Sequence, residues 1–168
     1  ETWLEAATAA VRECVKELGG YTVQAIAFSG NMSSPVFLDA ARRPVYRCML
    51  VGDARCAQQA KELTRAFAEE FRSASGNIPD ACFVAAKLLW FRENCPEAYA
   101  RTTQFVFAKD YLRYQFTGVL NTEPTDAGNT LLYDVQTADW NWALIERIGL
   151  RKDIFPLLLP STAQAGAL

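Results

Sequence analysis

A run of small polar residues is the first place in this sequence where chemistry could occur. Residues 29–34, Ser-Gly-Asn-Met-Ser-Ser, follow a short apolar run over residues 22–28. Asn31 and Ser33 offer short donors and acceptors that suit hydroxyl groups, and Met32 offers an adaptable apolar wall. Because ligands of layered α/β folds bind beyond the carboxyl ends of the central strands, this loop is a candidate binding site. The alternative is an ordinary polar turn.

A second candidate is the pair Asp53 and Arg55. A carboxylate and a guanidinium two residues apart could bracket a polyol. The alternative is that Asp53 caps the following helix and forms a surface ion pair with Arg55.

Lys87 interrupts an apolar helix, where a lone lysine usually extends its ammonium to solvent. Asp110 and Asp126 read as structural carboxylates, one at a helix start and one in a turn.

The composition argues against several other kinds of site. The 168 residues include no histidine, and the five cysteines stand singly without a C-x-x-C pair. This argues against a metal site and against Ser-His or Cys-His catalysis, so that a carboxylate would do any acid–base work. Scattered single cysteines are typical of reduced, packed residues in a cytoplasmic protein. The formal net charge of −2, with acids and bases interspersed, provides no basic stripe for nucleic acid or membrane lipid.

Short apolar runs that alternate with helical stripes predict one α/β layered domain. We expect helices over residues 3–18, 57–71, 83–93, 110–116 and 140–148, and strands over 22–28, 35–39, 44–50, 104–108 and 131–135. The nearly continuous apolar run at 22–28 predicts a central parallel strand buried on both faces. The two runs that follow it predict a hairpin turning at 39–43.

Five segments carry, in order, motifs that occur together in one protein family: AIAFSGNM at 25–32, DAR at 53–55, KLLWFREN at 87–94, KDYLRYQFTG at 109–118 and TDAGNTLLYD at 125–134. Together they resemble the amino-terminal domain of the FGGY carbohydrate kinases, and the xylulose kinases among them in particular. The resemblance implies an actin-like ATPase fold of two ribonuclease-H-like domains. Residues 1–168 would be part of the amino-terminal, sugar-binding domain, and the second, nucleotide-binding domain would lie outside this chain.

The resemblance also implies an activity, the ATP-dependent phosphorylation of a sugar or polyol. ATP and Mg²⁺ would be bound mainly by segments outside this chain, and the catalytic base is expected after Leu168. The first residue is not methionine, and the last residues form no closing helix, so we expect a longer parent protein. The expected partner is the sugar or polyol, without nucleic acid or membrane; a homodimer is left open.

For the binding site, the resemblance implies that Asn31, Met32 and Ser33 contact the sugar and that Asp53 and Arg55 lie near it. The family motif has histidine where this chain has Ser33. Because a network of hydroxyl contacts built for one sugar rejects others, this exchange leaves the sugar itself open. It also keeps two alternatives open, a non-catalytic sugar-binding or regulatory module of the same fold and a degenerate relative without a ligand.

Overall fold

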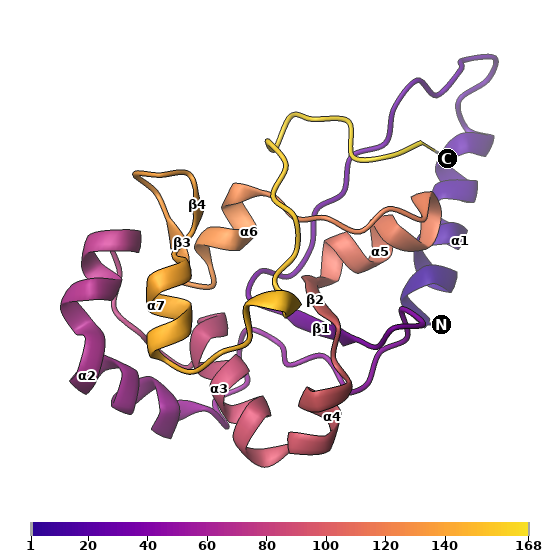
Figure 1. Ribbon diagram of the computed structural model, residues 1–168. Coiled ribbons are helices and arrows are strands. Elements are labelled where there is room, and N and C mark those ends of the chain that lie inside the picture. The colour runs from indigo at the N-terminus through magenta and orange to yellow at the C-terminus, as the bar shows by residue number, and fades with distance from the viewer. Residues whose placement is uncertain (1, 168) are drawn as a thin grey trace.

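The computed structural model describes residues 2–167. Its elements are α1 (Thr2–Lys16), β1 (Pro35–Leu38), α2 (Ala57–Ser75), α3 (Val84–Asn94), α4 (Pro96–Arg101), β2 (Gln104–Phe107), α5 (Ala108–Thr117), α6 (Pro124–Gly128), β3 (Tyr133–Asp134), β4 (Asp139–Trp140), α7 (Trp142–Arg147) and the 3-10 helix η1 (Lys152–Ile154). Figure 1 shows β1 and β2 near the centre, α2 and α7 on one side, and α5 and α1 on the other. No helix among the described residues has the length and apolarity needed to span a membrane.

The strands β1 and β2 pair antiparallel and divide the core. Because successive side chains of a strand point to opposite faces, Phe37 and Phe107 enter the main core, whereas Val36 and Val106 face a smaller cluster. Phe37 stacks on Phe91 of α3, with ring centroids 3.9 Å apart. This contact fixes α3, which is buried along most of its length, against the sheet.

Several predicted elements are confirmed. The helices predicted at 57–71 and 83–93 correspond to α2 and α3, and the strand predicted at 104–108 corresponds to β2. The helix predicted at 110–116 is α5, and it ends at Gly118, whose left-handed backbone (φ +70°) only glycine adopts without strain. The helix predicted at 140–148 is present in shorter form as α7.

The central strand predicted at 22–28 is wrong. This segment has no regular secondary structure, and nearly all of its residues are exposed. A buried parallel strand needs a hydrogen-bonded neighbour on each side, and among residues 2–167 the sheets contain only β1 with β2 and β3 with β4. The segment instead lies across α5 at the edge of the structure (Figure 1).

The hairpin predicted over residues 35–50 is also wrong in its second half. The turn forms, because the Asp39 amide donates to the Arg43 carbonyl at 3.0 Å. Beyond it, only an isolated bridge joins Leu38 to Pro44, and β1 takes β2 as its partner instead. The helix at 3–18 is present as α1, but none of its residues is buried. The apolar periodicity at 3–18 therefore predicts the helix correctly, but its apolar stripe is not buried in the structure.

Candidate functional site

A cavity of about 1050 Å³ lies where three parts of the chain meet. One wall is the irregular segment at 23–30 together with Met32, and another is the chain from 159 to 167. Figure 1 shows these two segments running along the same side of α5 and α6. The third wall is polar and comes from α5, α6 and the loop between them; its lining residues are Lys109, Arg113, Thr117, Asn121, Thr122, Glu123, Thr125, Asp126 and Asn129.

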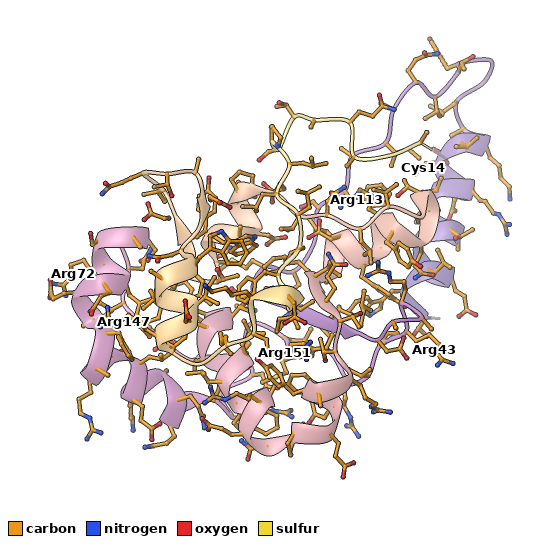
Figure 2. The ribbon with its side chains drawn as sticks, in the orientation of Figure 1. Cys14, Arg43, Arg72, Arg113, Arg147 and Arg151 are labelled. Carbon is orange, nitrogen blue, oxygen red and sulfur yellow. The ribbon has the colours of Figure 1, made fainter. Side chains whose placement is uncertain are left out.

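The polar wall is organised around the ammonium of Lys109. Lys109 Nζ lies 2.8 Å from Asp110 Oδ1, 2.9 Å from Asp126 Oδ2 and 3.3 Å from Glu123 Oε1. Arg113, labelled in Figure 2 on α5, adds a second cation 3.2 Å from Asp110 Oδ1. Three carboxylates therefore face two cations. Asp110 is fully buried outside the cavity lining, so the two cations and the carboxylates of Glu123 and Asp126 leave the wall itself without net charge.

These carboxylates do not fit a divalent metal. The Lys109 ammonium already occupies the centre of the group. Among residues 2–167, no cluster of three or more His, Cys, Asp or Glu side chains is arranged to hold a metal ion. The wall is instead a hydrogen-bonding surface of fixed charges, suited to a ligand with several hydroxyl groups.

The charges of this wall respond differently to burial. Burial alone would lower the pKa of Lys109, but the Asp110 and Asp126 carboxylates outweigh it and raise that pKa. Burial raises the pKa of Asp126, and the hydrogen bond from Lys109 offsets this only in part. For Glu123, burial is outweighed by hydrogen bonds from Ser161 and Thr125, which hold its pKa at about 2. Glu123 is thus a fixed anion at neutral pH, whereas Asp126 takes up a proton more readily than an ordinary aspartate.

Local structure explains how the wall is positioned. The strand β2 leads directly into α5, whose first turn carries Lys109, and the Asp110 carboxylate accepts from the Phe107 amide at 3.4 Å. Gly30 packs directly on this turn, because a Cβ atom at that position would lie 3.1 Å from Lys109 Cβ. The absence of a side chain at Gly30 therefore lets the 23–30 segment approach α5 and close the cavity.

The three residues of the predicted loop occupy different environments. Met32 lines the cavity and is 47% exposed. Asn31 is exposed beside it, and its Oδ1 accepts from Ser34 Oγ at 2.5 Å. Ser33 is fully buried outside the lining, in the left-handed region at φ +53°, and its Oγ has no hydrogen-bond partner among residues 2–167.

Asp53 and Arg55 do not line the cavity. They form an ion pair with 2.8 Å between Asp53 Oδ1 and Arg55 Nε, and Arg55 Nη1 donates to the Tyr46 hydroxyl at 3.1 Å. The Arg55 guanidinium also lies over the ring of Trp90, 5.0 Å from its centroid. The alternative reading of Asp53 as a helix cap is wrong, because α2 starts only at Ala57 and the Asp53 carboxylate accepts from Arg55 instead.

Lys87 connects the two predicted regions, and the expectation that it reaches solvent is wrong. Its side chain is fully buried, and its Nζ donates to the carbonyls of Ser33 at 2.7 Å and Leu50 at 2.8 Å. The Lys87 ammonium therefore donates its hydrogen bonds to these two backbone carbonyls instead of to water.

Sequence reasoning missed the polar wall. The sequence predicts only structural roles for Asp110 and Asp126 and assigns no role to Lys109 or Glu123, because nothing in their spacing indicates that these side chains meet in the folded chain. The interpretation of all five cysteines as packing residues is wrong for Cys14, which is exposed on α1 (Figure 2). The other four are buried or half-buried, and all five are free.

The sequence and the fold of this chain are both similar to those of known sugar kinases. Residues 1–168 match the N-terminal domain of the FGGY family of carbohydrate kinases. The xylulose kinase of Lactococcus lactis is 35% identical over 147 residues, which are 88% of this chain and 29% of the relative. The xylulose kinase of Bacillus subtilis is 31% identical over 170 residues, covering 100% of this chain and 34% of the relative.

A solved structure, that of a xyloylose kinase from Brucella ovis, has a TM-score of 0.84 and 31% identity over 98% of this chain and 33% of its own. The chain thus spans about a third of the length of the proteins it matches. The mixed helix and strand structure is consistent with part of the N-terminal domain of the actin-like ATPase fold that these sugar kinases share. From its sequence over the full 168 residues and from its fold, this chain belongs to the FGGY family of carbohydrate kinases.

Proposed function

We propose that the full-length protein carrying this chain transfers the γ-phosphoryl group of ATP to a hydroxyl group of a sugar or polyol. Residues 2–167 contribute part of its sugar-binding side. The observation that carries this proposal is the cavity: its polar wall and the family's 25–32 motif face the same space, in a chain that matches the FGGY N-terminal domain throughout. The xylulose kinases among its relatives support a ketose or polyol as substrate.

The predicted contact residues take different parts in this proposal. Met32 would pack against the carbon skeleton from within the cavity, and Asn31 would offer its amide at the rim. Ser33 would shape the loop through its backbone and contact the sugar only after the loop moves, because it is buried. Asp53 and Arg55 would support the loop from behind, through the segment that Lys87 links to it.

In the transfer step, a sugar hydroxyl oxygen forms a bond to the γ-phosphorus while the bond from that phosphorus to the bridging oxygen breaks and ADP leaves. The hydroxyl proton passes to a carboxylate base, which the resemblance places after Leu168. ATP and Mg²⁺ would be held by parts of the protein outside this chain, since the carboxylates described above are engaged by Lys109 and Arg113. We place this reaction in the cytoplasm.

The test is ADP release by the full-length protein with Mg-ATP and a panel of ketoses, aldoses and polyols. Turnover above the sugar-free rate with one panel member is the expected result, and it would also identify the substrate. A folded protein that binds a panel sugar in calorimetry but releases no ADP would overturn the kinase assignment in favour of a non-catalytic sugar-binding module.

A further inference from the structure

Lys87 has an environment that packing alone does not explain. It is fully buried within α3, between the equally buried Ala86 and Leu88. It forms no ion pair within residues 2–167, and its Nζ is bound only by the carbonyls of Ser33 and Leu50. Burying a lysine charge without a carboxylate is costly, and an apolar side chain would avoid that cost but leave both carbonyls without this donor. The distinctive property of this ammonium is therefore the link that it forms between these two carbonyls.

The two carbonyls belong to distant parts of the chain that reach this point separately. Ser33 lies 54 residues before Lys87 in sequence, and Leu50 lies 37 before it. Ser33 directly follows Met32, which lines the cavity, and Leu50 leads into the segment containing Asp53 and Arg55. One ammonium thus fixes the distance between the loop at the cavity and the segment behind it.

The loop is strained at Ser33, although Ser34 Oγ donates within the loop to Asn31 Oδ1 and to the Met32 carbonyl. Ser33 adopts a left-handed backbone conformation, which strains a residue with a side chain, and its buried hydroxyl has no hydrogen-bond partner within the described part of the chain. A strained conformation persists only where the surroundings determine it. The bond from Lys87 to the Ser33 carbonyl, at 2.7 Å, provides that constraint directly at the strained residue.

We propose that Lys87 is a positioning residue for the sugar. By holding the Ser33 and Leu50 carbonyls together, it keeps Met32 at the cavity wall and so sets the geometry in which the sugar binds. This inference rests on the proposed function. The loss of Lys87 should act on sugar binding, because the residue contacts the loop of the cavity, whereas the proposed function places ATP on parts of the protein outside this chain.

The test uses the full-length protein, with Lys87→Met as the variant and Lys61→Met, an exposed lysine on α2, as its matched control. The Michaelis constants for sugar and for ATP and the kcat are measured together with the melting temperature. We expect Lys87→Met to raise the Michaelis constant for the sugar about tenfold or more, as a displaced binding loop does, and to leave that for ATP unchanged. Lys61→Met leaves both at the wild-type values.

A second variant keeps the test decisive where the methionine variant does not fold. Lys87→Gln retains uncharged donors that are less costly to bury, but its shorter side chain reaches at most one of the two carbonyls. It should still raise the Michaelis constant for the sugar severalfold. A folded variant with an unchanged constant, or an equal rise for sugar and ATP, would overturn the positioning role. Absence of turnover in the wild-type protein with every sugar would instead overturn the proposed function, and the inference with it.

Discussion

Glu123→Gln would remove a carboxylate on which hydrogen bonds from three directions converge. Its oxygens accept from the amides of Thr125 at 2.9 Å and Asp126 at 3.0 Å, and from the Ser161 hydroxyl at 2.6 Å. Lys109 Nζ lies 3.3 Å away. Glutamine has a similar shape, but it carries no charge and one of its two oxygens is replaced by a donor group. The substitution therefore removes the charge and reduces the acceptor capacity without opening a cavity.

The magnitude follows from the pKa of Glu123. Burial acts against the charge, yet the hydrogen bonds lower this pKa from 4.5 to about 2. At about 1.4 kcal/mol for each pKa unit, the folded state favours the carboxylate over the neutral acid by roughly 3 kcal/mol. The Glu123 side chain is only 13% exposed, so solvent screening reduces this value little. Because glutamine resembles the neutral acid, we expect Glu123→Gln to lower the free energy of unfolding by about this amount at pH 7.

The pH dependence has a definite sign. A carboxyl whose pKa is lowered on folding stabilises the protein above its unfolded pKa, near 4.5, and this contribution is lost as the pH falls toward 2. Urea unfolding of wild type and variant at pH 7, 5 and 3.5 should therefore show a difference that narrows below pH 4.5. Glu69→Gln is the control, since that side chain is 81% exposed, and such surface pairs contribute little. Two results would refute this account of Glu123: a loss of unfolding free energy at pH 7 no larger in Glu123→Gln than in Glu69→Gln, or a loss in Glu123→Gln that does not change with pH.

Two further substitutions test the packing around the site. Phe37→Ala removes a fully buried ring that stacks on Phe91, and it should lower the free energy of unfolding by about 3–5 kcal/mol. Its control, Tyr21→Ala, lies at an 82% exposed position and should change the free energy of unfolding little. Similar losses for the two variants would contradict the position of Phe37 in the core. Gly30→Val places a side chain against Lys109, where a Cβ would already be 3.1 Å from Lys109 Cβ, and should raise the Michaelis constant for the sugar by moving the 23–30 segment off α5. Gly52→Val is its control, because a Cβ there meets no atom within 4 Å, and equal kinetics for the two variants would exclude the close approach at Gly30.

Elements set by local sequence could be predicted, and those set by distant partners could not. The helix α5 and its end at Gly118 follow from periodicity and from one left-handed glycine. The apolar run at 22–28 carries the same local signal as the run that forms β2, yet only the second has a paired strand. Local hydrophobicity indicates that a segment could be buried, but pairing depends on which other segments lie beside it.

The candidate site shows the same division. The polar loop at 29–34 was identified from residue type, and Met32 does line the cavity. The position of Lys87 was mispredicted because its two carbonyl partners are brought to it only by the folded chain. The polar wall around Lys109 was missed for the same reason, since its carboxylates come from α5, from α6 and from the residue just before α6.

The most direct test of the central claim is to block the cavity and measure sugar kinetics. Met32→Trp adds bulk to the cavity lining. Its control is Ile78→Trp, at a comparably exposed position, 45% against 47%, outside the lining. In the full-length protein, with the sugar found in the ADP-release panel, Met32→Trp should raise the Michaelis constant for the sugar about tenfold or more, equivalent to about 1.4 kcal/mol of binding. The Michaelis constant for ATP should stay at the wild-type value in this variant. In Ile78→Trp, the Michaelis constants for the sugar and for ATP should both stay at the wild-type values. Wild-type sugar kinetics in a folded Met32→Trp protein would contradict the placement of the sugar in this cavity.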